Sequence, residues 1–175
     1  QLDIDFQQIS DSGVEIIRWF VLCDGRSSPE FNVQGYPTTL EEDFYDDMDT
    51  LLDIAEKHHL FVVPVLFDFY WLGSAEIING TQMGGHADTF YDVDKKDSLV
   101  ENVILPIFDH YGEHPSIYAW DIINEPEHAM TNPDDSWIGD GISSTDMIVF
   151  VSELTDMIHQ HTEHHPLATH RRLLG

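Results

Sequence analysis

Apolar residues gather in three runs along the chain, at 14–22, 60–69 and 117–123, with a weaker fourth run at 167–174. Their hydrophobicity is continuous rather than alternating, which is typical of strands that are covered on both faces. Strands of this kind occur in parallel sheets with helices packed on each side. The pattern therefore predicts a parallel sheet of three strands and a short fourth one.

Between these runs the apolar residues recur at helical spacing, which predicts helices within 3–13, 38–59, 95–112 and 143–162. Thr38 and Thr39 each precede a glutamate by three residues, as in a capping box, and Ser144 is the expected N-cap of the last helix. Pro106 should kink the third of these helices or start a new turn, because proline lacks the N–H that a helix interior needs.

The predicted order is one helix, then three strand–helix units, then a short strand, which indicates right-handed βαβ connections. This order fits either a (β/α) barrel or an open doubly wound sheet. No glycine-rich phosphate loop follows any strand, so a nucleotide-binding open sheet has no support and the barrel is favoured. Pro64 lies inside the second apolar run, where we expect an edge position or a bulge, because proline cannot donate to a sheet.

The charge of the chain is strongly negative and narrows the choice of partners. The 33 Asp and Glu residues against 7 Lys and Arg give −26, and protonation of all 11 His would still leave −26 + 11 = −15. Nucleic acids and anionic membranes would be repelled, and no apolar run approaches the ~20 residues of a membrane span. Cys23 is the only cysteine, so no internal disulfide can form, and its apolar neighbours predict a buried thiol.

Polar and aromatic side chains lie at the ends of the three strong runs. They are Arg18 in the first run, Asp68, Tyr70 and Trp71 at the second, and Asn124, Glu125, Glu127 and His128 at the third. The carboxyl ends of parallel barrel strands meet at one face and form the active site there. Cleavage of a glycosidic bond needs a proton donor, a second carboxylate and flat apolar faces for sugar rings. This group supplies all of these except a clearly placed second carboxylate.

The segments "RWFVLCDGR", "VLFDFYWLG" and above all "IYAWDIINEPEH" resemble the second, third and fourth strands of family 5 glycoside hydrolases. That family is the cellulase and mannanase type of (β/α)8 barrel. The resemblance implies an α/β fold, a partial (β/α)8 TIM barrel made of about strands two to five with flanking helices. We therefore expect residues 1–175 to form a single catalytic-domain fragment of such a barrel.

The resemblance also implies roles for individual residues. Glu125 matches the acid/base at the end of the family's fourth strand, and Asn124 matches the amide that holds the sugar 2-hydroxyl. Arg18 matches the arginine that lies beside the nucleophile in this family. We expect Pro126 to hold Glu125 in an extended conformation, because the residue before a proline is restricted.

The remaining strand-end residues are predicted to bind substrate. Asp68, Tyr70 and Trp71 are candidate sugar contacts, although each could equally be a core or rim residue, and Glu127 and His128 are assigned to the rim of the cleft. Strands one and six to eight of the family have no counterpart in the chain. The nucleophilic glutamate of the seventh strand is missing with them, so the isolated fragment is expected to be inactive.

The resulting hypothesis is a retaining endo-β-1,4-glycanase, such as a cellulase or mannanase, that cleaves β-linked poly- or oligosaccharide. Retention is implied by the resemblance alone. We expect no cofactor and no metal, no nucleic acid or membrane partner, an extracellular location, and the missing C-terminal half of the barrel as a second partner. The alternatives are a non-catalytic carbohydrate-binding or structural barrel fragment and another hydrolase of the same clan.

Two clusters invite a metal interpretation that we do not favour. The histidines 159, 161, 164, 165 and 170 lack a cysteine, and imidazolium groups at a helix C-terminus are favoured by its dipole. Asp92, Asp94 and Asp97 lack the glycine and glutamate of a calcium loop and are expected to open a helix.

Overall fold

The computed structural model describes residues 1–131, 141–162 and the backbone of 166–167. Its centre is a four-stranded sheet in the order β1 (Ile16–Cys23), β4 (Phe61–Asp68), β7 (Trp120–Asn124) and β8 (Pro166–Leu167). Every neighbouring pair in this sheet is parallel. The predicted parallel sheet is therefore confirmed. Its strand β8 spans Pro166–Leu167, and the rest of the predicted run at 167–174 lies outside the described residues.

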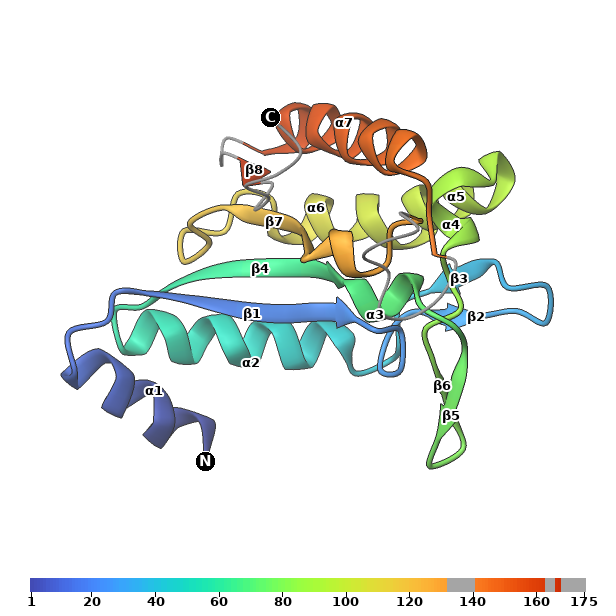
Figure 1. Cartoon of the computed structure of the whole chain (residues 1–175). Helices are drawn as coiled ribbons and strands as arrows, with labels where there is room; N and C mark the ends of the chain where they lie inside the picture. Colours follow the sequence, from blue (N-terminus) through green and yellow to red (C-terminus); the bar gives the residue numbers. More distant parts are fainter. Residues whose placement is uncertain (132–140, 163–165, 168–175) are drawn as a thin grey trace.

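Helices lie on the faces of this sheet, and two small hairpins extend beyond it (Figure 1). The longer helices are α1 (Leu2–Asp11), α2 (Phe44–Lys57), α5 (Val93–Leu99), α6 (Leu105–Tyr111) and α7 (Ser144–His161). The shorter ones are α3 (Phe69–Leu72), α4 (Asp88–Tyr91), the π-helix η1 (Val100–Ile104) and the 3₁₀ turn η2 (Pro126–His128). The hairpins pair β2 (Glu30–Phe31) with β3 (Pro37–Thr39) and β5 (Glu76–Ile78) with β6 (Thr81–Met83).

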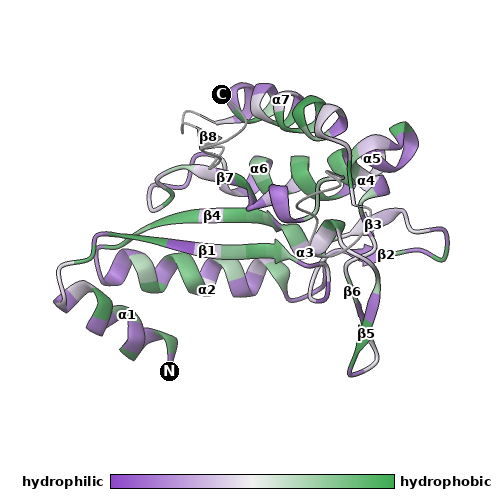
Figure 2. Ribbon diagram, in the orientation of Figure 1, coloured by the Kyte–Doolittle hydropathy of each residue, from purple (hydrophilic) through white to green (hydrophobic). Residues whose placement is uncertain are grey.

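Helix α2 shows how the sequence pattern produces the layers. Its buried residues are Phe44, Met48, Leu51, Leu52 and Ala55, which form one face at helical spacing. Figure 2 shows apolar and polar residues alternating along this helix as its two faces turn past the viewer. The helix lies against β1 and β4, while α6 and α7 lie on the side of β7 and β8 (Figure 1).

The predicted start of α2 is wrong. Thr38 and Thr39 belong to strand β3, and the helix begins at Phe44 after an Asp43 N-cap that makes no side-chain hydrogen bond. The short hairpin takes up the two threonines because β-branched residues fit a strand well. A capping box on its own therefore did not locate the helix.

The interruption predicted at Pro106 is confirmed. The chain runs from α5 through the π-helical turn η1 into α6, in which Pro106 occupies the first turn. A wider turn before the proline avoids the missing N–H and the clash of the ring with the preceding carbonyl. The N-cap of α7 is Ser143 rather than the predicted Ser144, because the Ser143 side chain accepts the N–H of Asp146.

Pro64 lies on an inner strand, so of the two expected alternatives, an edge position or a bulge, the edge position is excluded. It pairs with Trp19 on β1, while the other side of β4 faces β7. Between the Val62–Ile117 bridge and the Val65–Asp121 pair, the chain advances three residues on β4 and four on its partner. The ladder is therefore irregular where the missing proline N–H would have been needed, which fits the rule that proline occurs at such places.

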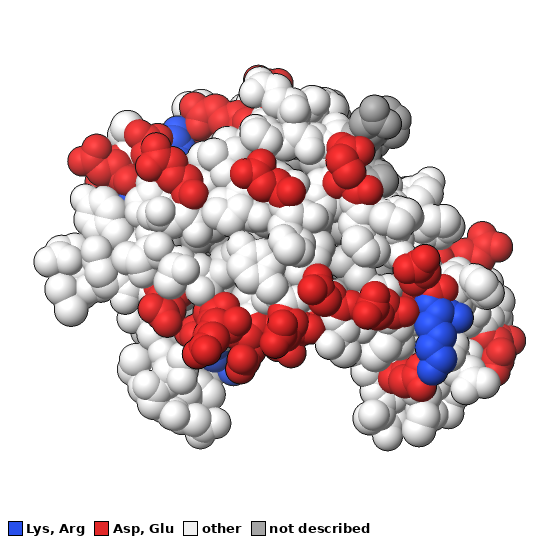
Figure 3. Space-filling model, turned by 180° about the vertical axis from the view of Figure 1, so that it is seen from behind, with Lys and Arg blue, Asp and Glu red and all other residues white. Residues whose placement is uncertain are grey.

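The surface carries the acidic excess that the composition predicts. Seen from behind, carboxylates form several groups across the molecule, with lysine and arginine in only a few places (Figure 3). Within the part of the chain that the structure describes, no helix is both long and apolar enough to cross a membrane.

Candidate active site

The carboxyl ends of β1, β4 and β7 point toward the same end of the sheet, where α3 and both hairpins lie (Figure 1). The Cα atoms of Asp68 and Asn124 face each other as the last register pair of β4 and β7. Arg18 reaches this place from β1, since its Nη2 donates to Asn124 Oδ1 at 3.3 Å. The predicted convergence of these three residues from three strands is present.

Arg18 is fixed by a carboxylate that the sequence analysis did not single out. Its Nη2 lies 2.5 Å from Oδ2 of Asp121, whose side chain is fully buried. Asp121 stands three residues before Asn124 on β7, so one strand supplies both partners of the arginine. Asp24, the carboxylate that follows β1, is paired with Arg26 at 2.8 Å and not with Arg18.

Asn124 is held from two sides. Its Oδ1 accepts from Arg18, and its Nδ2 donates to Asp68 Oδ2 at 2.8 Å. The other carboxylate oxygen of Asp68 accepts the backbone N–H of Tyr70 at 3.0 Å and thereby caps α3. A chain of polar contacts thus runs from Asp121 through Arg18 and Asn124 to Asp68.

Glu125 follows this chain of contacts and projects outward, with its side chain 58% exposed. Its Oε2 lies 3.8 Å from His128 Nε2. The backbone of Glu125 is left-handed, with φ 45° and ψ 48°, so the predicted extended conformation is wrong. The turn is needed because β7 ends at Asn124 and η2 begins at Pro126. A residue with a side chain in this region stores about 1–3 kcal/mol of strain, which occurs mostly at functional sites.

Asp68 is turned inward and is only 5% exposed. Burial raises the pKa of its carboxyl, and the negative charges of Asp24 and Glu125 add to the rise. The N–H of Tyr70 and the amide of Asn124 oppose it, because they stabilise the ionised form. The side chain is therefore placed to hold neighbouring groups rather than to meet a substrate in solution.

The two aromatic candidates differ in their exposure. Trp71 is fully buried, its indole N–H donates to Thr89 Oγ1 at 3.1 Å, and its ring packs edge-on against Phe67. No sugar ring can stack on it, so the prediction of a substrate platform is contradicted for Trp71. Tyr70 is 43% exposed and remains a candidate for that role.

The rim residues are half-buried. Glu127 and His128 both lie in η2, and the imidazole of His128 meets the ring of Phe69 edge-on at 5.2 Å. A pocket of about 590 Å³ opens between the end of β1 and the hairpin of β5 and β6, and its lining includes Phe20, Asp24 and Asn79. This pocket lies at the end of the sheet where the predicted site is formed.

Cys23 and the histidine cluster bear on the chemistry of the site only slightly. The thiol is half-buried, and burial is the main reason that its pKa rises to about 11, so it is not poised as a nucleophile.

His159 and His161 lie in the last turn of α7, while the other three histidines of the cluster fall outside the described residues. Across 1–131 and 141–162, no three potential ligands are gathered so as to hold a metal ion. Asp92 caps α5, as predicted.

Relatives in sequence include proteins named mannan endo-1,4-beta-mannosidase. Over 125 residues the chain is 27% identical to the mannan endo-1,4-beta-mannosidase of Cryptopygus antarcticus, in an alignment that covers 70% of this chain and 30% of the relative. Over 119 residues it is 26% identical to the enzyme of the same name from Mytilus edulis, with 68% and 30% covered. No family model matches the chain.

Solved structures show the same fold. The beta-1,4-D-mannanase from Cryptopygus antarcticus superposes with a TM-score of 0.79 at 22% identity and covers 94% of this chain and 47% of that one. For the beta-1,4-mannanase from Aplysia kurodai the TM-score is 0.74 at 24% identity, with 94% and 50% covered. A GH5_18 protein from Bifidobacterium longum in complex with Manb1-4GlcNAc gives 0.66 at 18% identity, with 94% and 36% covered.

These likenesses confirm the partial (β/α)8 barrel and the resemblance to family 5 glycoside hydrolases. The chain spans half or less of the length of the solved structures above.

Proposed function

We propose that this chain carries the acid/base half of a retaining endo-β-1,4-glycanase that acts on mannan. The observation that carries the proposal is the arrangement at the end of β7, where Asn124 is held by Arg18 and Asp68 and the outward Glu125 follows it. The mannan-specific relatives favour mannan over cellulose as the substrate. An extracellular location and assembly with the remainder of the barrel are part of the same proposal.

In the first step Glu125 acts as the general acid. It gives its proton to the glycosidic oxygen while a carboxylate from outside these 175 residues attacks the anomeric carbon, so that the leaving sugar departs as an alcohol. In the second step the Glu125 carboxylate removes a proton from water, and that water displaces the enzyme carboxylate. Anomeric configuration is retained because two displacements occur.

The surrounding residues have supporting roles in this scheme. The Asn124 amide would bind the hydroxyl next to the anomeric carbon, where a hydrogen bond strengthens as the oxocarbenium-like transition state forms. As the family resemblance implies, the positive charge of Arg18 would lie beside the attacking carboxylate, and Asp121 holds Arg18 at 2.5 Å. Tyr70 is the exposed aromatic side chain that could support a sugar ring.

The test uses the protein expressed from its complete reading frame, with Glu125→Gln compared with Glu127→Gln on mannan and on cellulose. Loss of the acid/base should reduce kcat about 10²- to 10⁴-fold, because general acid–base catalysis contributes that much. Glu127→Gln is the matched control, since it removes a carboxylate two positions away, and its kcat should fall much less.

The rival function is sugar binding without catalysis, which the exposed Tyr70 would serve equally well. It predicts that the wild-type protein binds mannooligosaccharide but releases no reducing ends, and that Glu125→Gln leaves binding unchanged. Calorimetric titration together with a reducing-sugar assay separates the two functions.

A further inference from the structure

We propose that Asp68 is a positioning residue that sets the orientation of the Asn124 amide and thereby aims one of its N–H groups at the substrate. The inference rests on the proposed function, in which that amide binds a sugar hydroxyl. It replaces the expectation from the sequence that Asp68 itself contacts substrate.

The two contacts of the Asn124 amide permit only one orientation. Arg18 offers only N–H donors, and it meets the amide oxygen at 3.3 Å. Asp68 as a carboxylate offers only acceptors, and it meets the amide nitrogen at 2.8 Å. If the amide were flipped, donor would face donor and acceptor would face acceptor. The orientation is therefore dictated by the chemistry of the two neighbours.

Asp68 is itself held rigidly enough to act as a guide. It is the last residue of β4, it pairs in register with Asn124, and its second oxygen accepts the N–H of Tyr70 at 3.0 Å. Rotation of the carboxylate would break the cap of α3. The end of β4 and the start of α3 therefore hold Asp68 Oδ2, which is the acceptor for the Asn124 amide, in a fixed position.

The consequence for the substrate follows from counting N–H groups. A primary amide has two, and Asp68 accepts one of them, so the second remains for a sugar hydroxyl. A neutral asparagine at position 68 could present either its oxygen or its nitrogen to Asn124, so it would not impose a direction. The carboxylate form therefore supplies the second of the two contacts, beside that of Arg18, that set which way the amide points.

The burial of Asp68 argues against a purely stabilising role. At 5% exposure its negative charge is costly, and two N–H donors offset this cost only in part. In some proteins a buried charged group is retained because it specifies an arrangement rather than because it adds stability, and we infer the same for Asp68. Here the arrangement is the direction of one amide beside the proposed proton donor.

The kinetic experiment uses the complete protein with Asp68→Asn, which keeps size and shape but loses the directing charge. On an aryl β-mannoside we expect kcat to fall about 10²-fold, as for a misplaced catalytic contact, with KM changing much less. On the 2-deoxy analogue, which lacks the hydroxyl that the amide would bind, the fall should be several-fold smaller. An equal fall on both substrates, or no fall on either, would overturn the proposal.

A matched control is Asp24→Asn, because Asp24 is equally buried at the neighbouring strand end but bonds Arg26 and not Asn124. It should leave the ratio of the two substrates close to that of the wild type. If the wild-type protein cleaves no β-glycoside at all, the proposed function fails while the orientation of the amide can still be tested.

That structural test is made on the wild-type chain by nuclear magnetic resonance, so it does not depend on the folding of a variant. The side-chain amide of Asn124 is identified by its disappearance in Asn124→Ala. We expect its two protons to exchange with solvent at different rates, the one bound to Asp68 being the slower. Equal exchange of both protons would contradict the proposed contact directly.

Discussion

Strands β1 and β4 are neighbours with similar apolar sequences, IIRWFVLC and FVVPVLFD, yet the structure buries them very differently. On β4 every residue after Phe61 is buried, because β1 and β7 pair with its two edges and helices cover its faces. On β1 only Leu22 is buried, and Ile16, Trp19 and Phe20 are each more than a third exposed. Equal hydrophobicity has therefore not produced equal burial.

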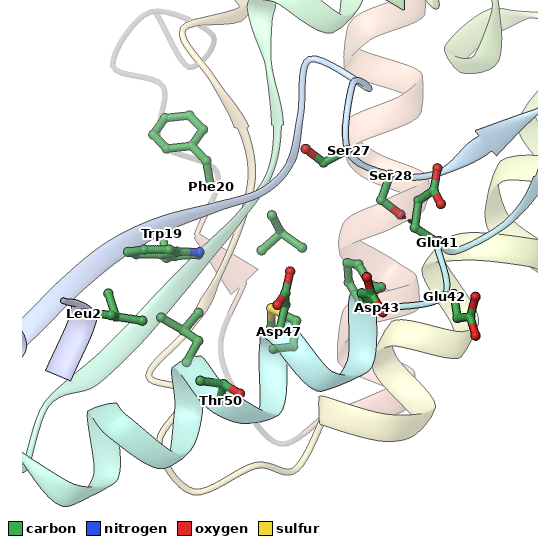
Figure 4. A pocket seen from close by; sticks show the side chains of 14 residues that line it. Leu2, Trp19, Phe20, Ser27, Ser28, Glu41, Glu42, Asp43, Asp47 and Thr50 are labelled. Carbon is green, nitrogen blue, oxygen red and sulfur yellow. Dashed lines mark hydrogen bonds between the residues drawn. The ribbon is translucent and has the colours of Figure 1, made fainter. Parts of the chain in front are cut away.

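The difference teaches what the apolar pattern of a strand records. It indicates how much of the strand's surface is suited to burial. It does not indicate whether the residues that would bury this surface are among those that the structure describes. Beside β1 a pocket of about 700 Å³ is lined by Trp19 and Phe20 on one side and by Asp47 and Thr50 of α2 on the other (Figure 4). Glu125 is not among the residues that line this larger pocket, so we do not connect the pocket with catalysis. We connect it with the open side of β1, which we define as the edge that pairs with no other described strand together with the exposed side chains Ile16, Trp19 and Phe20.

Truncation in the covered strand should have the largest effect. Leu66 is fully buried on β4, and Leu66→Ala should lower the free energy of unfolding by about 2–5 kcal/mol, through lost transfer energy and a new cavity. Ile16→Ala on β1 should cost about 1 kcal/mol or less, because Ile16 is 42% exposed. Urea unfolding of the 175-residue chain measures both.

The same pair of variants tests whether β1 is covered in the complete protein. There the cost of Ile16→Ala should rise toward that of Leu66→Ala, because the side chain would then lose buried contacts. If Ile16→Ala costs equally little in the 175-residue chain and in the complete protein, β1 is not covered in the complete protein.

A buried titratable ring between β6 and α4, outside the two strands, gives the next largest effect. His86 is 5% exposed and stacks on Phe31 at 3.9 Å, and burial lowers its pKa to about 4. Asp88 and Asp24 pull this pKa upward, but less strongly than burial lowers it. Between about pH 6.5 and 4 the unfolded chain therefore binds the proton more tightly than the folded one.

Stability should consequently fall as the pH drops through this window and level off below it, by up to about 3 kcal/mol from His86. His86→Gln should remove that part of the slope in urea unfolding at a series of pH values. His110→Gln on the exposed face of α6 is the control and should retain the slope. A slope identical in the wild type and His86→Gln would contradict the burial of the ring.

The smallest effect on stability is expected on the open strand itself. Phe20→Ser should change the free energy of unfolding by about 1 kcal/mol, close to the value for Ile16→Ala, since the two side chains are similarly exposed at 39% and 42%. It should nevertheless weaken self-association of the chain, because an apolar sheet edge is a template for pairing with other molecules. Sedimentation velocity over a range of concentrations measures this.

Val33→Ser provides the control, since Val33 is almost completely exposed but lies in the hairpin of β2 and β3. If both variants reduce association equally, the open side of β1 is not its cause.

The elements with strong periodicity were predictable from the sequence, and their side-chain partners were not. The three strands and the body of the helix at 44–57 follow from apolar spacing. The strand-end rule places Asn124 and Glu125 at the end of β7, whereas Arg18 is the third residue of β1 and was proposed from the family resemblance. Asp121 was missed, although its place in an otherwise apolar strand was a signal that a buried cation partner is near.

Two further failures concern local geometry. Trp71 comes three residues after a strand end, but α3 turns it into the core, and a single sequence does not say which way a short helix will turn a side chain. The left-handed backbone of Glu125 opposes the usual preference before proline, so only the fold can impose it.

The central claim is that Glu125 is the acid/base of a retaining glycanase, and chemical rescue of Glu125→Gln in the complete protein tests it most directly. With an aryl β-mannoside whose leaving group needs no proton, the variant should form the glycosyl-enzyme but hydrolyse it slowly. Azide, which needs no general base, should then restore turnover and yield the β-mannosyl azide with retained configuration. Full activity of the variant on mannan, or rescue that gives the α-azide, would contradict the account.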